Sequence, residues 1–593
     1  MDQPRDRTSS RSDSGTRSAA AWLKDPRVRA VGWVLAFACV LVGALVMLWP
    51  VLIAPLAADQ RHMYAEAPGQ TAGHWTRMFT IPIGDIRFRL NQGRFAPLAF
   101  IVQWVSYTGV TLMAMATSTS VATVQAAQKI VLLILSLGSV VGFAAALRGR
   151  TPAGTLVRFG RGALLLVAAA VTVLGAVGTQ AQLQPANGWT TYAVLTYGAI
   201  IVGFGVPALA LWLARRRTVA PSRLLTVLTV LVLGLVAAGL NSSYELYYVA
   251  VPVAVVTLAL QPLAPAADRA RERRAKLFVG GTLTALFLVA LVAVRAAISY
   301  ACASGPCYIG TSPKIDAGIV KTWLYNFGSS VPLSGRSEVL TTLKAVGQDT
   351  LPGPFSSPLV VFAFLAAGGL LLVRLLLGPL GLGRIVAPGT AGETADDAAV
   401  DTADETADET VDAPAARKAL SVAALHGAIA ALLIAFGSAA MMSISRQAQD
   451  VILSFGHVYR HTVVTWVALA ATATFVALAI DLRATWRKSI VLWSAVALVA
   501  ALVGGAVLPI NLAATHAASV DPGTLAVTRI YDELVLADPS DAGEQRRCDA
   551  VRQARKGLAG KGPTSGRMLK GLYQIYRYKY GKPFCSSITI RGA

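Results

Sequence analysis

Side chains that can exchange protons or bind anions gather in one polar stretch of an otherwise apolar sequence, residues 58–97. The stretch directly follows the first long apolar run, opens with A-A-D-Q-R-H-M-Y-A-E and closes with G-D-I-R-F-R-L-N-Q-G-R-F-A-P-L. Its candidate groups are Asp59, Arg61, His62, Tyr64, Glu66, His74, Asp85, Arg87, Arg89 and Arg94. The functional interpretation is an active-site loop on the outer membrane surface, with Asp59 just beyond the membrane edge. The alternative is an ordinary solvated loop.

Groups of the same kinds occur in two further loops and at one helix end. The segment N-S-S-Y-E-L-Y-Y contributes Glu245, and S-R-Q-A-Q-D-V-I-L-S-F-G-H-V-Y-R-H contributes His457 and Arg460. Arg295 lies near the outer end of its apolar run, where an ionisable residue is costly and tends to be kept for a partner. Each arginine taken singly is equally well explained by contact with lipid headgroups. Their common location at one interface favours a shared site.

The composition that surrounds these groups is that of a polytopic helical membrane protein. Of the 593 residues, 55% are hydrophobic and only 14% are charged, and apolar runs long enough to cross a bilayer recur along the chain. Backbone amides in lipid must be paired within their own segment, so these runs are predicted to be helices and the fold class to be all-α. The formal charge of +22 does not indicate nucleic-acid binding, because Lys and Arg lie mostly in short loops, where they set membrane orientation.

Four basic loops predict how the chain crosses the membrane. They lie at 148–161, 215–223, 269–276 and 483–488. Placing them in the cytoplasm with the N-terminus predicts about 11 transmembrane helices and an outer C-terminus. Segment 97–117 carries several Gln, Ser, Thr and Tyr residues and is predicted to lie in the outer interface or to re-enter it. If it spans instead, the added crossing puts one basic loop on the wrong side.

Composition also divides the chain into parts. The Ser- and Arg-rich N-terminus is predicted to be disordered, and an acidic run with a repeated T-A-D-E unit is interpreted as a linker rather than a divalent-ion site. The parts are a cytoplasmic N-terminus (1–29), a first transmembrane part (30–377) with outer loops 58–97 and 299–357, an acidic cytoplasmic linker (378–418), the last three transmembrane helices (419–511) and a small extracytoplasmic α-helical tail (512–593).

Four cysteines fall in segments that the charge pattern places outside. Cys302 and Cys307 begin the second outer loop, and Cys548 and Cys585 lie in the tail. The disulfides Cys302–Cys307 and Cys548–Cys585 are the natural pairing in an oxidising exterior. A zinc site is the rival interpretation, but the spacings match no zinc pattern.

The layout of the first hundred residues resembles the GT-C class of membrane glycosyltransferases, polytopic helical enzymes whose first outer loop carries an acidic catalytic residue. Asp59 matches that position, and G-R-F-A-P-L at 93–98 is similar to the G-R-x-x-P element that often closes the loop. The usual acidic pair is not matched, because Asp59 stands alone and Glu66 follows seven residues later. The second acid, and the use of a divalent metal ion, therefore stay open.

The resemblance implies transfer of a sugar from a polyprenyl-phosphate donor to a cell-envelope glycan or lipid acceptor. Asp59 would be the general base that takes the proton of the acceptor hydroxyl. Arg94, Arg460 and Arg295, in that order, would bind the departing lipid phosphate, because a guanidinium fork matches phosphate oxygens.

Other residues would hold the sugar. Asp85 or Glu245 would bind its hydroxyl groups, and His457 would orient either substrate. The full set of expected substrate-binding residues is Arg61, His62, Glu66, Asp85, Arg94, Glu245, Arg295, His457 and Arg460.

A transporter, flippase or polysaccharide polymerase without sugar transfer by Asp59 is the alternative function, and a membrane scaffold that presents its tail is a third. Ionisable residues do not recur deep in several apolar runs, which weakens the transporter hypothesis. The sequence contains no G-x-S-x-G, H-E-x-x-H, Walker or dinucleotide motif. Its Ala-, Val- and Arg-rich composition is typical of a high-GC bacterium such as an actinobacterium. Together with the apolar runs, this origin predicts a multi-pass protein of the cell membrane.

Overall fold

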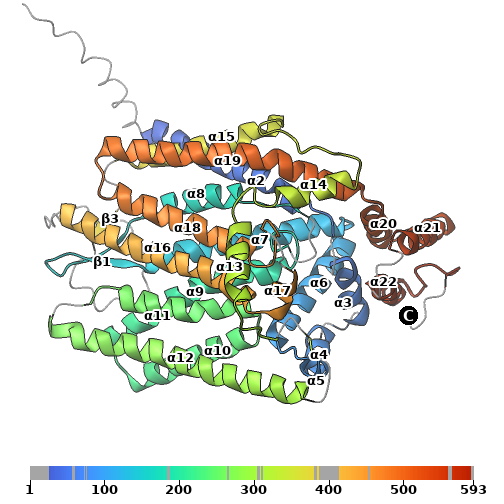
Figure 1. Cartoon of the computed structure of the whole chain (residues 1–593), viewed down its shortest axis with the longest axis horizontal. Coiled ribbons are helices and arrows are strands. Elements are labelled where there is room, and N and C mark those ends of the chain that lie inside the picture. Colours follow the sequence, from blue (N-terminus) through green and yellow to red (C-terminus); the bar gives the residue numbers. More distant parts are fainter. Residues whose placement is uncertain are drawn as a thin grey trace, which may run out of the picture.

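Helices make up nearly all of the structure, which forms an elongated bundle with a small helical domain at one end (Figure 1). The computed structural model describes residues 26–56, 60–71, 74, 76–182, 187–263, 266–303, 307–308, 312–378, 383–385, 413–451, 455–558 and 564–588. Asp59, residues 1–25 of the predicted disordered N-terminus and most of the acidic linker lie outside these residues.

Ten helices of the described chain are long and apolar enough to cross a membrane, which confirms the predicted all-α polytopic class. They are α2 (Pro26–Leu52), α6 (Pro97–Thr117), α7 (Val121–Ala146), α9 (Ala193–Val219), α10 (Arg223–Asn241), α12 (Ala266–Cys302), α15 (Val361–Leu377), α16 (Ala413–Ser443), α18 (Thr462–Asp481) and α19 (Trp486–Val520). Two shorter apolar segments lie in the same bundle, α8 (Arg161–Val177) and the continuous η1 (Glu245–Val249) and α11 (Ala250–Leu260).

Helix α6 has both of its ends at one end of the bundle, the end that the charge pattern predicts to face outward and that we call the outer end. The Leu98 amide in its first turn donates to the Ser242 carbonyl (2.9 Å), which follows α10. Near its last turn, Lys579 of the C-terminal domain donates to the Met115 carbonyl (3.3 Å). This placement fits the predicted interfacial helix. Because α6 is itself one of the ten long apolar helices of the described chain, the predicted number of crossings, about eleven, stays a prediction.

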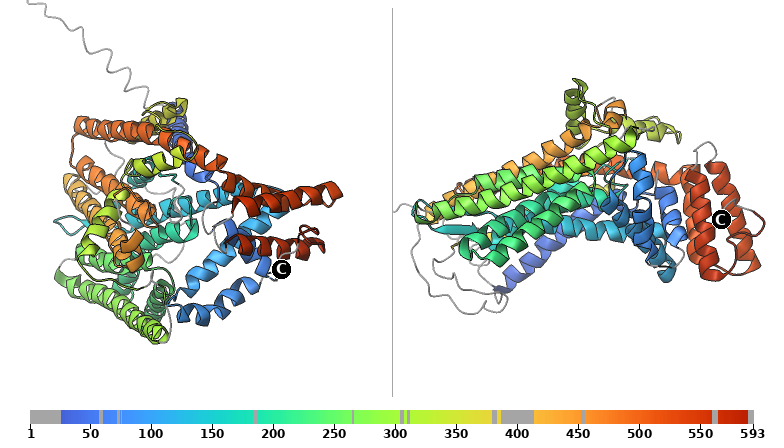
Figure 2. Two further views of the ribbon diagram at one scale, coloured as in Figure 1. Left: turned by 45° about the vertical axis from the view of Figure 1, so that its right-hand side comes forward. Right: turned by 90° about the horizontal axis from the view of Figure 1, so that it is seen from below.

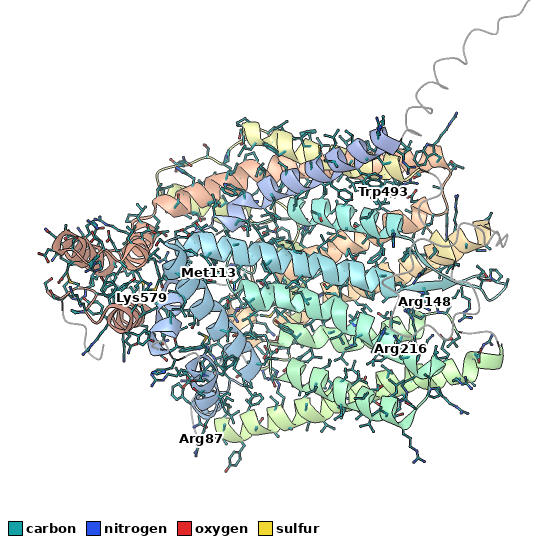
Figure 3. All side chains as sticks on the ribbon, turned by 180° about the vertical axis from the view of Figure 1, so that it is seen from behind. Arg87, Met113, Arg148, Arg216, Trp493 and Lys579 are labelled. Carbon is teal, nitrogen blue, oxygen red and sulfur yellow. A yellow bond between two sulfur atoms is a disulfide. The ribbon has the colours of Figure 1, made fainter. Side chains whose placement is uncertain are left out.

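The opposite end of the bundle carries a small sheet and most of the basic loops. Strands β1 (Arg148–Arg150), β2 (Leu156–Phe159) and β3 (Gly383–Ile385) pair antiparallel in that order. Arg148 and Arg216 lie at this end and Arg87 and Lys579 at the other (Figure 3). Strand β3 lies near the start of the predicted linker and pairs its Arg384 with Arg158 of β2.

A buried ion pair ties three helices together at this inner end. Arg374 of α15 donates from Nε to Oδ2 of Asp481 (2.8 Å) and from an Nη to Oδ1 (3.0 Å). Trp493 of α19 donates to the same Asp481 carboxylate (3.1 Å), and Arg374 also donates to the Gly378 carbonyl (2.9 Å). The charge of Arg374 is therefore fully neutralised inside the fold.

Short helices occupy the outer segments that the sequence predicted as loops. They are α3 (Gln60–Thr71), α4 (Arg77–Gly84), α5 (Ile86–Asn91), α13 (Gly318–Ser329), α14 (Arg336–Lys344), η2 (Pro358–Val360) and α17 (Arg446–Val451). Helix α14 is held by Val339 and Leu343, which are fully buried in a cluster with Ile510, Ala514 and Ala517 of α19. The outer layer is thus packed on the bundle by apolar contacts.

The predicted helical tail forms a three-helix domain after α19, which continues to Val520, past the expected end at 511. Its helices are α20 (Pro522–Leu536), α21 (Asp541–Gly557) and α22 (Thr564–Tyr580). Asp521 begins α20 by accepting a hydrogen bond from the Thr524 amide (2.9 Å), with Pro522 at the first helical position. A disulfide joins Cys548 and Cys585, as predicted.

Helix α22 docks this domain onto α3, beside the blue helices of the outer layer (Figure 2). The two backbones approach closely at a pair of glycines. A Cβ on Gly69 would lie 2.5 Å from the Gly571 carbonyl oxygen, and one on Gly571 would lie 2.3 Å from the Ala65 carbonyl oxygen. Only glycine fits at either position, so this crossing fixes α22 against the polar first loop.

Candidate functional site

A cavity of about 710 Å³ opens at the outer end of the bundle, between the outer helices, the helix ends and α22. Seven of the nine predicted substrate-binding residues line it: His62, Glu66, Arg94, Glu245, Arg295, His457 and Arg460. They come from α3, the α5–α6 connection, η1, α12 and the segment before α18. The fold therefore brings together polar groups that lie up to four hundred residues apart in sequence.

The other two predicted residues do not line the cavity. Arg61 turns toward the C-terminal domain, where it donates to the Leu56 carbonyl and to Thr524 (3.3 Å each). Asp85 is half exposed and faces Arg89 at 3.8 Å. Asp59, the predicted catalytic acid, lies outside the described residues and immediately precedes Gln60, the first residue of α3, in sequence.

The Cys302–Cys307 disulfide supports the position of Arg94, and its formation confirms the predicted pairing. Gly93 has a positive φ of 78°, and a Cβ there would lie 3.0 Å from the sulfur of Cys307. The guanidinium of Arg94 lies 3.4 Å from the ring centroid of Tyr308, whose amide donates to the Gln92 carbonyl (2.7 Å). The disulfide, the glycine turn and the tyrosine thus form one support for the arginine.

Arg460 lies among tyrosine rings. Its guanidinium carbon is 4.7 Å from the ring centroid of Tyr192, 5.8 Å from that of Tyr244 and 5.9 Å from that of Tyr459. Such rings attract a cation through their faces without neutralising it. Among the described residues, no carboxylate lies within ion-pair distance of Arg460 or of Arg94. Within the described chain, both cations are therefore held in place without a carboxylate partner.

The tyrosines add hydrogen-bond donors to this wall. Burial raises the pKa of Tyr244 and of Tyr459, an effect that the nearby Arg460 opposes only in part. Both phenols therefore stay protonated at neutral pH and can donate to an anion.

Carboxylates are fewer than arginines in the lining. Five arginines line the cavity, the predicted Arg94, Arg295 and Arg460 together with Arg89 and Arg567, against the two carboxylates Glu66 and Glu245. Glu245 faces Arg295 at 3.7 Å, which supplies the partner predicted for Arg295. Glu66 faces His62 at 3.6 Å. The excess of positive charge suits an anionic ligand.

Apolar side chains of the cavity lie next to these charges. Phe100 and Trp104 of α6, Leu195 of α9 and Met441 of α16 contribute to the lining. Phe100 also lies under Arg89, 3.9 Å from the guanidinium carbon to the ring centroid. A cavity with a cationic wall and an apolar wall matches an amphipathic ligand.

His457 has a carboxylate partner that the sequence did not indicate. Its Nδ1 lies 2.7 Å from Oε1 of Glu338 on α14. Arg567, which α22 brings to the cavity from the C-terminal domain, was not predicted either. Neither residue carries a local signal, because both lie on amphipathic helices where a charged residue ordinarily faces water.

No protein-family model, curated protein or solved structure matches this chain. The resemblance to GT-C glycosyltransferases stays a prediction based on Asp59 and on the G-R-F-A-P-L element. Among the described residues, no group of three or more His, Cys, Asp or Glu side chains is arranged to hold a metal ion. The use of a divalent ion also stays a prediction.

Proposed function

We propose that this protein is a membrane glycosyltransferase that works on the outer face of the bilayer, moving a sugar from a polyprenyl-phosphate donor to a glycan or lipid acceptor of the cell envelope. The observation that carries the proposal is the convergence of Arg94, Arg460 and protonated tyrosines on one cavity at the outer helix ends. In sequence, Asp59 directly precedes α3, the helix that contributes His62 and Glu66 to the lining.

The cations suit a phosphate leaving group. When the bond between the sugar and the phosphate breaks, negative charge grows on the phosphate oxygens, and cations held in place beforehand stabilise it without reorganisation. Arg94 and Arg460 meet this need best, because aromatic rings rather than carboxylates hold them. Arg295 is the weaker candidate, since Glu245 faces it at 3.7 Å.

The apolar wall suits the lipid part of such a donor. The side chains of Phe100, Trp104 and Met441 line the cavity beside the arginines and can contact a polyprenyl chain. The lining carboxylates Glu66 and Glu245 can accept hydrogen bonds from sugar hydroxyls. Asp59 is proposed as the general base that accepts the proton of the acceptor hydroxyl.

The test is release of sugar from a panel of labelled polyprenyl-phosphate hexoses and pentoses by the purified protein in lipid nanodiscs, with envelope glycan fragments as acceptors. Wild type should consume at least one donor, and both D59N and R460Q should lose about 10²-fold or more of the rate with unchanged protein level. R87Q serves as the control, because Arg87 is an exposed residue of α5 outside the cavity lining. Consumption of no donor, or an undiminished D59N, would reject the proposal in favour of a transporter or scaffold.

A further inference from the structure

The pair His457–Glu338 has a geometry that fits acid–base chemistry at the cavity. His457 lines the cavity, whereas Glu338 is not among its described lining residues, so the carboxylate stands behind the imidazole as seen from the cavity. Oε1 of Glu338 lies 2.7 Å from Nδ1, so Nδ1 carries a hydrogen and donates it in a hydrogen bond to the carboxylate. The second ring nitrogen, Nε2, is then the one that is left for a ligand.

The scaffold holds both partners of this pair firmly. Gly456, next to His457, has a positive φ of 95°, and a Cβ there would lie 2.4 Å from the Ser334 carbonyl oxygen, just before α14. The Gly456 amide donates to the Ser329 hydroxyl (2.9 Å). Glu338 stands beside Val339, which is fully buried against α19. The contact between the carboxylate and the imidazole is therefore built into the packing of two segments.

The groups around His457 can be named within the described part of the chain. Glu338 of α14 contacts its ring, Tyr459 and His461 of its own segment lie near it, and Arg460 follows three residues later in sequence. Burial lowers the pKa of His461 to about 4, and its Nε2 lies 2.8 Å from the Asn326 carbonyl oxygen, so it stays neutral. The second oxygen of Glu338 is buried and has no hydrogen-bond partner among the described residues. The carboxylate is thus available to stabilise an imidazolium.

We propose that His457 is the proton donor to the departing lipid phosphate and that Glu338 is its positioning residue, an inference that rests on the proposed glycosyl transfer. The acceptor oxygen forms a bond to the sugar carbon while the bond from that carbon to the phosphate oxygen breaks, and the electron pair goes to the phosphate. The proton of the acceptor hydroxyl goes to the general base, and the proton on Nε2 of His457 goes to the phosphate oxygen. Arg460, three residues along the same segment, holds the phosphate for this step.

The proposal predicts that binding of a lipid phosphate charges His457. The probe is farnesyl phosphate, a short polyprenyl phosphate, titrated into the full-length protein in detergent at pH 7.5 by calorimetry in buffers of different ionisation enthalpy. The slope of binding enthalpy against buffer enthalpy counts the protons taken up. Wild type should take up protons on binding, and H457Q should lose that uptake while still binding.

Variants separate a positioning role from a structural one. E338Q keeps the shape and a hydrogen bond but removes the charge, so proton uptake should fall while the melting temperature stays that of wild type. K344Q is the matched control, because Lys344 is exposed on the same helix. With a donor that the nanodisc panel identifies, H457Q should lower kcat about 10²-fold with little change in KM.

The outcomes distinguish this inference from the proposed function. Binding of farnesyl phosphate with equal proton uptake in wild type, H457Q and E338Q would overturn the role of the pair and leave glycosyl transfer standing. Absence of any farnesyl phosphate binding by wild type would overturn both. If E338Q fails to fold, H457Q alone still decides, since its uptake is either lost or kept.

Discussion

Arginines at the two ends of the bundle are held in different ways. At the inner end, Arg374 is 2% exposed and forms a two-bond ion pair with Asp481. At the outer end, Arg460 is partly exposed to the cavity and lies among the rings of Tyr192, Tyr244 and Tyr459. Both are surrounded by protein, but only the first has its charge cancelled there.

The difference separates a structural cation from a ligand-binding one. Burying a charge is costly unless it is paired, so the ion pair at Arg374 serves the fold. Aromatic faces hold a cation in place yet leave its field open toward the cavity. In the proposed function, Arg460 is therefore available to an anion that arrives from outside the protein.

The largest expected effect is on stability at the inner end. R374L leaves the Asp481 carboxylate buried without its counter-charge, so the free energy of unfolding should fall by about 3–5 kcal/mol. Unfolding of the purified protein in mixed micelles measures the loss. R483L, at an exposed arginine of the same end, is the control and should unfold like wild type. Equal losses in the two variants would remove the distinction between paired and unpaired arginines.

The opposite pattern is expected at the outer end. R460Q should lower the rate of sugar transfer by about 10²–10³-fold, because it removes a cation aimed at the leaving phosphate. Its melting temperature should stay close to that of wild type, since no described carboxylate depends on Arg460 for its partner. If R460Q unfolds more readily than wild type but keeps the wild-type rate per folded molecule, Arg460 has a structural role instead.

A smaller effect is expected from the support behind Arg94. The double variant C302S/C307S opens a loop with a sequence separation of only 5, so the stability loss should be about 2 kcal/mol or less. Affinity for farnesyl phosphate should nevertheless fall about fivefold, because the position of Arg94 over Tyr308 loosens. A calorimetric titration measures this. An affinity equal to that of wild type would show that the disulfide does not support the site.

The smallest effect is expected from R94K. Lysine keeps the charge but loses the planar stacking on Tyr308, which is worth about 0.5–1 kcal/mol, or roughly two- to fivefold in Kd for farnesyl phosphate. If R94K loses as much affinity for farnesyl phosphate as R460Q does, Arg94 binds the phosphate through the bidentate geometry that lysine lacks.

Sequence patterns predicted the helices and the disulfides because both depend on local information, namely apolar run length and loop charge. Within the site, these patterns identified the types of residue better than the directions in which their side chains point. His62 and Glu66 are one helical turn apart and share the cavity face of α3, whereas Arg61, one residue earlier, is rotated by about 100° and points to α20. The helix that produces this separation was itself predicted as a loop.

Residues missing from the predicted site come from distant segments. Glu338 and Arg567 reach the site only through the docking of α14 on α19 and of α22 on α3, and no local pattern encodes those contacts. No local sequence pattern predicts strand β3 either, since it has only three residues and forms by pairing with β2.

The central claim, that the outer cavity holds an unneutralised cation for a lipid phosphate, is tested most directly by comparing farnesyl phosphate with farnesol. Thermal stabilisation by each compound is measured for wild type and for R460Q in the same detergent. We expect farnesyl phosphate to stabilise wild type, farnesol to do so far less, and R460Q to remove the difference. Equal stabilisation of wild type by the two compounds would show that no such cation recognises the phosphate.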